Sequence, residues 1–186
     1  KGGSDEKVKP ETVLSAISNA KNKGLDPAEL EDDFFAHLAV AYQNELRAQN
    51  AVDFDDLLLF GEKILREHED VRNMFREKFT RVTVDEFQDT NALQMKLLQQ
   101  LVGPPYHVCV VGDDDQSIYG WRGAEVDNIL RFEKDFPGAK LIRLERNYRS
   151  TPHILAAASG LIAANKSRLG KTLWTDLNEG ERVSVR

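Results

Sequence analysis

The sequence lacks several features that mark large classes of protein. It holds one cysteine, so no intramolecular disulfide can form, and a reducing compartment, the cytoplasm, is expected. No apolar run approaches the ~18 residues of a membrane span, and no signal peptide opens the chain, so we expect no membrane partner. Basic residues are not in excess, because 25 Lys and Arg stand against 31 Asp and Glu. This balance argues against a module that coats nucleic acid by charge alone.

What is present is enough for a folded core. The chain has 186 residues, of which 41% are hydrophobic and 30% charged, which is typical of one domain, or of one domain and part of another. The net charge of −6 is unevenly spread, because residues 140–171 contain many basic side chains and a single acidic one, Glu145. A solvated helix face or an anion-binding surface would both explain that stretch. The chain opens on Lys1 rather than Met, and we interpret it as an internal fragment.

Two patterns of secondary structure follow each other along the chain. Residues 1–79 have the apolar spacing of helices. One helix is expected to start at Pro10, a second at the run Asp26-Pro27-Ala28-Glu29, extending to about Gln49, and a third after the cap Asp53. The core face of the third helix is expected to be Leu57, Leu58, Gly61, Ile64 and Leu65. A shorter helix is expected over 71–79. From residue 80 on, short strands alternate with helices. Strands are predicted at 81–84, 107–111, 140–144 and 182–185, with 107–111 buried on both faces, and helices at 92–101 and 151–164. The alternation predicts an α/β fold with parallel strands.

Carboxylates follow the first predicted strand. Asp85 and Glu86 stand at its end, where α/β sheets bind their ligands. One carboxylate can hold a hydrated Mg²⁺ while its neighbour orients and deprotonates a water, which is what nucleotide hydrolysis requires. Acids that cap a strand end are the alternative interpretation.

Polar and aromatic side chains follow the next two predicted strands. Gln116 suits a terminal phosphate or an attacking water, and the nearby Tyr119, Trp121 and Arg122 offer flat faces for stacking bases. An acidic calcium loop is disfavoured, because the run 113–115 lacks the alternating ligands and terminal Glu of an EF-hand. After the third strand, a Tyr beside an Arg, residues 148 and 149, can stack a base and pair with phosphate oxygens.

Together these segments resemble a known family. Asp-Glu-Phe-Gln-Asp-Thr (85–90), Gly-Asp-Asp-Asp-Gln-Ser-Ile-Tyr-Gly-Trp-Arg-Gly-Ala (112–124) and Asn-Tyr-Arg-Ser (147–150) resemble motifs II, III and IV of the UvrD/Rep/PcrA group of superfamily 1 DNA helicases. Segments 51–58 and 173–176 also resemble that family. The resemblance implies a partial RecA-like (P-loop NTPase) domain over 80–175, preceded by a helical inserted subdomain (1B-like) over 1–79. Residues 176–186 would lead towards a second motor domain.

The resemblance also implies a role for each motif residue. For the cofactors ATP and Mg²⁺, Asp85 would bind the metal, Glu86 would be the general base, Gln116 and Arg149 would contact the γ-phosphate, and Tyr148 would stack on adenine. For single-stranded and duplex DNA, the contacts would come from Tyr119, Trp121 and Arg122. The whole protein would be an ATP-dependent helicase that acts in DNA repair or replication.

One required motif is missing from the 186 residues. The phosphate-binding loop G-x-x-x-x-G-K-[ST] does not occur, and Gly170-Lys171-Thr172 is no substitute, because Asn165 stands where the first Gly is needed. We therefore expect no ATPase activity from this chain alone, and an exposed sheet that favours self-association. Two alternatives remain: a non-catalytic single-stranded-DNA-binding module, and part of a RecB/AddA-type helicase–nuclease. The second motif ends in Gly-Trp-Arg-Gly-Ala (120–124), which favours a whole protein of the UvrD type.

Overall fold

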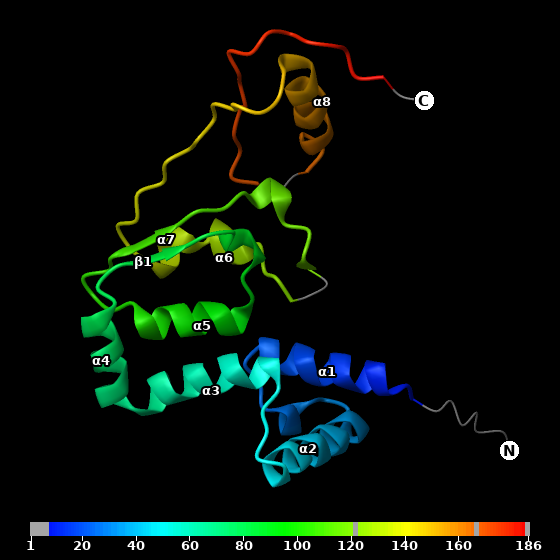
Figure 1. The fold of residues 1–186 in the computed structure, drawn as a ribbon, viewed down its shortest axis with the longest axis vertical. Coiled ribbons are helices and arrows are strands. Elements are labelled where there is room, and N and C mark those ends of the chain that lie inside the picture. The colour runs from blue at the N-terminus through cyan, green and yellow to red at the C-terminus, as the bar shows by residue number, and fades with distance from the viewer. Residues whose placement is uncertain (1–7, 121–122, 166–167, 185–186) are drawn as a thin grey trace, which may run out of the picture. The chain divides into compact units, whose positions relative to one another are not determined.

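The computed structural model describes residues 8–120, 123–165 and 168–184 (Figure 1). They form two compact units. The described residues of 8–113 and 117–128 make up the first unit, and those of 114–116 and 129–184 make up the second. Among the described residues, none of the helices combines the length and the apolar character needed to cross a membrane. The expected domain division at residues 79 and 175 stays a prediction.

The first unit begins with a series of helices. They are α1 (Pro10–Asn22), the 3-10 helix η1 (Pro27–Glu29), α2 (Asp33–Ala48), α3 (Phe54–Glu67) and α4 (Glu69–Lys78). The predicted starts at Pro10 and Asp53 are confirmed. Asp53 forms a reciprocal capping box with Asp56, in which each side chain accepts a hydrogen bond from the other residue's backbone N–H.

The predicted helix from Asp26 is wrong at its start. Asp26 does accept a bond from the Ala28 N–H (2.9 Å), but it caps only η1, since Leu30 is extended (φ −61°, ψ 135°). The long helix α2 begins instead after a second cap, Asp32, whose Oδ1 accepts from the N–H groups of Phe34 and Phe35. Two capping acids lie six residues apart in sequence, and the chain uses both, one for each helix.

A short parallel sheet follows the helices. Strand β1 (Val82–Val84) pairs with β2 (Val108–Val110), and helix α5 (Ala92–Leu101) connects them (Figure 1). The predicted α/β fold with parallel strands is confirmed to this extent. Burial of β2 on both faces is wrong: its valines are half-buried, whereas Cys109 and its partner Thr83 are exposed on the opposite face. Because one face of this two-stranded sheet is exposed, the sheet does not form the centre of the hydrophobic core.

The core of the first unit lies between helices. Helix α3 packs against α4 and α5, and α1 packs against α2, α3 and α5. Its buried apolar side chains include Ile17, Ala39, Leu65, Phe87 and Leu93. The predicted core face of α3 is partly wrong, because Leu57 and Ile64 are exposed and Leu65 is buried. The carboxylate of Asp56 is buried on this helix instead.

An ionic cluster occupies part of that core. The Lys21 ammonium on α1 lies 2.7 Å from Asp53 Oδ2 and 2.7 Å from Asp56 Oδ1, and the Tyr42 hydroxyl donates to Asp53 Oδ2 (3.1 Å). Burial by itself would raise the pKa of Asp53, but the hydrogen bonds from Lys21 and the Asp56 N–H and the Lys21 charge lower it. Burial would likewise lower the pKa of Lys21, and the two carboxylates raise it above its ordinary value. The cluster ties α1, α2 and the start of α3 together.

The second unit has little regular structure. It contains η3 (Asp114–Gln116), α7 (Phe132–Asp135) and α8 (Pro152–Ile162), while the short α6 (Asp127–Leu130) lies where the chain passes from one unit to the other. The predicted helix at 151–164 is confirmed. The strand predicted at 140–144 is wrong: those residues form no strand, and the pairing falls later, as a single parallel bridge between Arg146 and Trp174. Residues 182–184 are also irregular, and residue 185 is not described. A β-branched or apolar run becomes a strand only when a neighbouring backbone pairs with it.

Candidate functional site

The carboxyl ends of β1 and β2 bring two of the motif segments together. The backbone N–H of Val111 donates to Val84 O (2.8 Å), and the N–H of Phe87 donates to Val111 O (3.0 Å). These bonds continue the parallel ladder past the ends of both strands. Asp85 and Glu86 therefore emerge beside the segment that starts at residue 112, as the order of the strands predicts.

Glu86 has an unusual backbone conformation. Its φ of 48° and ψ of 42° lie in the left-handed region, which costs a non-glycine residue about 1–2 kcal/mol. The Asp85 carboxylate accepts a bond from the Glu86 N–H (2.9 Å), and the Glu86 carbonyl accepts one from the Asp89 N–H (2.9 Å). Both Asp85 and Glu86 are exposed. A strained conformation that is held by its neighbours and faces solvent is typical of a functional position.

Gln88 holds the Glu86 side chain in place. Its side chain is buried, with only 1% of the residue exposed. Its Nε2 donates to Glu86 Oε2 (2.7 Å), and its Oε1 accepts from the Asp113 N–H (3.0 Å). Sequence reasoning assigned no role to this glutamine, since neither its type nor its position shows that it is buried.

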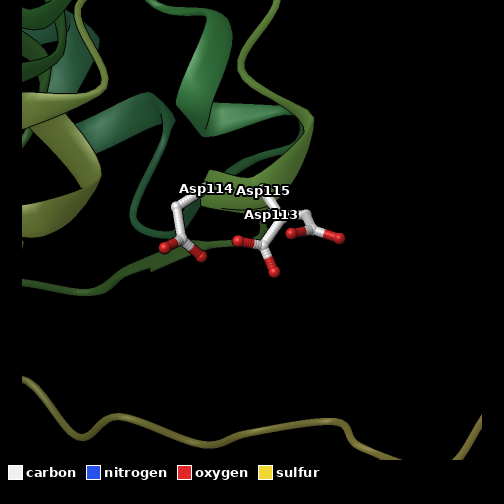
Figure 2. A group of neighbouring side chains, drawn as sticks. All are labelled: Asp113, Asp114 and Asp115. Carbon is white, nitrogen blue, oxygen red and sulfur yellow. The ribbon is translucent and has the colours of Figure 1, made fainter. Parts of the chain in front are cut away.

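The acidic run at 113–115 is prominent in the second motif (Figure 2). Carboxylate oxygens of Asp113, Asp114 and Asp115 lie within 4.8 Å of one another, as ligands of a cation would. Two of them are already engaged within the second unit. Asp115 makes a bidentate pair with the Arg168 guanidinium (2.8 and 2.5 Å), and Asp114 accepts from the Leu169 N–H (2.7 Å). These pairs agree with the sequence argument against a calcium loop.

The other predicted nucleotide-binding residues lie in the second unit. Gln116 ends η3, and Tyr148 and Arg149 stand in a turn before α8. The Asn147 side chain shapes this turn, because its Oδ1 accepts from the N–H groups of Arg149 (2.9 Å) and Ser150 (2.7 Å). Asp85 and Glu86 belong to the first unit. The predicted nucleotide-binding residues therefore form two groups, one in each unit.

Tyr148 is part of an exposed cation–aromatic stack. The residue is 75% exposed, and the Arg146 guanidinium carbon lies 4.9 Å from its ring centroid. The same guanidinium lies 5.3 Å from the ring of Trp174 and forms an ion pair with Asp176. One face of Tyr148 is thereby covered by a cation, and its exposure leaves area for a flat ligand. Sequence reasoning did not assign Arg146 or Trp174 to this position.

Of the three predicted DNA-contacting residues, one is described. Tyr119 is partly exposed, and its carbonyl accepts a bond from the Ala124 N–H (3.3 Å). Trp121 and Arg122 lie outside the described residues. The segment beyond them is fastened to the first motif, because the Glu125 N–H donates to Thr90 O (3.0 Å) and the Asn128 amide donates to the same oxygen (3.1 Å).

Comparison with known proteins identifies the family of this chain. The family described as "UvrD/REP helicase N-terminal domain" matches residues 3–137. The chain is 46% identical to "DNA helicase II" of Rickettsia typhi over 97% of its length, 45% identical to "DNA helicase II" of Escherichia coli over 95%, and 42% identical to "ATP-dependent DNA helicase PcrA" of Bacillus subtilis over 96%. It covers 29%, 25% and 25% of those proteins. The chain belongs to the UvrD-type family of superfamily 1 helicases.

Proposed function

We propose that the whole protein is an ATP-dependent DNA helicase that couples hydrolysis of Mg-ATP to movement along single-stranded DNA and to duplex unwinding, in repair or replication. Membership of the family and the printed names of the relatives support this. The observation that carries it is the end of β1, where the strained, exposed Glu86 lies beside Asp85 and is oriented by the buried Gln88. Within this family, the RecA-like domain would cover 80–175 and the helical subdomain 1–79.

The two carboxylates suit the metal and the water that this reaction uses. Both are exposed and offer hard oxygen donors, which Mg²⁺ prefers, and Asp85 would hold the ion. When bound to the phosphates, Mg²⁺ would neutralise part of their charge. Glu86 Oε2 is held by Gln88, which leaves its other oxygen, Oε1, to accept a proton from a water. A base needs this combination of a fixed carboxylate and an accessible oxygen.

The second unit would contribute the remaining nucleotide contacts. Tyr148 offers an exposed ring for adenine, and Arg149, in the same turn, a guanidinium for the γ-phosphate. Gln116, next to the ion-paired Asp115, would also contact the γ-phosphate. The phosphate-binding loop is not among the 186 residues, so we propose that this chain alone does not hydrolyse ATP.

The DNA contact would be made by stacking. Tyr119, with Trp121 and Arg122, would face the bases of the single strand, and each stacked base is worth ~1–3 kcal/mol regardless of its identity. This type of binding needs few positive charges and is therefore compatible with the net charge of −6.

The test is the Glu86→Gln substitution in the full-length protein. The variant keeps the side chain's length but removes the base, so DNA-stimulated ATP hydrolysis should fall by about 10²–10⁴-fold. Glu67→Gln, at the exposed end of α3, is the matched control and should leave the rate unchanged. Undiminished turnover in Glu86→Gln would rule out the assigned base.

A single-stranded-DNA-binding module without catalysis is the second candidate, and the partly exposed Tyr119 favours it. Titration of this chain with a single-stranded oligonucleotide separates the two ideas. Salt-sensitive binding that is lost in Trp121→Ala would support DNA contact by this chain. Absence of binding at low salt would reject the module.

Self-association through the exposed face of β1 and β2 is also proposed, and would appear as a concentration-dependent mass in sedimentation.

A further inference from the structure

Gln88 joins the two motif segments of the first unit at the position of the proposed base. It lies within the first motif segment, and its buried amide reaches the backbone of the second. We propose that Gln88 is a positioning residue through which the segment following β2 controls the orientation of the Glu86 carboxylate. The inference rests on the proposed function, since it concerns how hydrolysis at that site responds to DNA.

The orientation of the amide follows from its partners. The Asp113 backbone N–H can only donate, so the group facing it (3.0 Å) must be the Gln88 oxygen. The nitrogen therefore faces the carboxylates of Glu86 (Oε2, 2.7 Å) and Asp89 (Oδ2, 3.4 Å), which can only accept when ionised. Both ends of a planar group are thus engaged, and a shift of the Asp113 backbone is passed on to Glu86.

Other bonds between the segments act on the backbone instead. Ser117 Oγ donates to Gln88 O (3.4 Å), and Asn128 donates to Thr90 O (3.1 Å). Within the part of the chain that the structure describes, Gln88 is the one side chain that bonds to the Glu86 carboxylate. Burial strengthens this link, because no water competes for the amide.

The position of Asp113 suggests what the link transmits. Tyr119, one of the proposed base-stacking residues, follows it by six positions, and Ser117 bonds back to Gln88. A change in this segment when DNA binds would move the Asp113 N–H, and through Gln88 the carboxylate of Glu86. Gln88 would thus make ATP hydrolysis depend on DNA.

Two substitutions in the full-length protein separate the two bonds. Gln88→Glu keeps an acceptor for the Asp113 N–H but places a second carboxylate against Glu86. Gln88→Met keeps the length and loses both bonds. In both variants the DNA-stimulated kcat should fall about tenfold, with the KM for ATP and the affinity for DNA unchanged. In Gln88→Met the ratio of stimulated to basal rate should fall as well.

The matched control is Gln94→Met, the same substitution at a glutamine that caps α5 through the Asn91 N–H (3.0 Å). It should lower the melting temperature without changing the stimulation ratio. A second control is the double variant with Glu86→Gln. If Gln88 acts through Glu86, adding Gln88→Met to Glu86→Gln should lower the rate no further.

The outcomes are distinguishable. A wild-type protein without DNA-stimulated hydrolysis would overturn the proposed function, and the coupling with it. If the wild type is active, two results would overturn the inference alone. One is a DNA-stimulated rate of Gln88→Met within about twofold of the wild-type rate. The other is a rate loss in the double variant that equals the sum of the losses, in free energy, of Gln88→Met and Glu86→Gln. Hydrogen exchange supplies a readout without catalysis. The Asp113 amide should exchange faster in Gln88→Met but not in Gln88→Glu, and equal exchange in all three proteins would refute the link.

Discussion

Lys21 offers the sharpest test of how the helical part of the chain is held together. Lys21 is 0% exposed, and its ammonium nitrogen lies 2.7 Å from a carboxylate oxygen of Asp53 and 2.7 Å from one of Asp56. Lys21→Met preserves the length and the burial of the side chain but removes the charge. Two carboxylates then face each other in the interior, and Asp56 has no access to water.

The size of the effect follows from what remains around the carboxylates. Removing one partner of a buried ion pair costs about 3–5 kcal/mol. Asp53 keeps the Tyr42 hydroxyl and a backbone N–H, and Asp56 keeps the Gln43 amide (3.2 Å), so we expect the lower value, about 3 kcal/mol. That loss is large beside the ~5–15 kcal/mol of a typical domain.

Urea unfolding followed by far-ultraviolet circular dichroism measures the loss. The triple variant Lys21→Met/Asp53→Asn/Asp56→Asn should recover most of it, because no unpaired carboxylate remains. Lys63→Met, at an exposed position on α3, is the matched control and should change stability by less than about 0.5 kcal/mol. A cost below about 1 kcal/mol for Lys21→Met, the range of exposed pairs, would refute the assignment of a buried charge cluster.

Three further predictions concern other contacts. Because the pKa of Asp53 is lowered in the folded state, its contribution to stability is complete above its unfolded pKa of about 3.9 and is lost as the pH falls through the folded pKa; urea midpoints against pH should show this, and Asp53→Asn should flatten the curve. Arg168→Ala breaks the bidentate pair with Asp115 and should destabilise the second unit by about 1–3 kcal/mol in thermal denaturation, an unchanged midpoint being the contrary result. Asn91→Ala removes the cap of α5 and the bond to Asn22 (2.8 Å), and should cost about 1–2 kcal/mol by urea unfolding; a loss below the error of the fit would contradict it.

Elements specified by neighbouring residues were predictable. The start of α1 at Pro10, the start of α3 after Asp53 and the whole of α5 depend on caps and periodicity within one or two turns. The strand predicted at 140–144 failed because strand formation depends on a pairing partner, which the sequence does not specify locally. The predicted core face of α3 was partly wrong for a related reason. Which of its predicted residues is buried, Leu65 but not Leu57, depends on the helices that pack around α3.

The candidate site divides in the same way. The sequence by itself determined the motif residues, their order and the family, because residue type and spacing carry that information. Only the tertiary structure decided that Gln88 is buried and spans from Glu86 to Asp113, a residue 25 positions away. It also decided that a lysine on α1 is buried by two carboxylates more than 30 residues further along. Such contacts join groups distant in sequence, and each is stable only where the surrounding fold excludes water and supplies the partner.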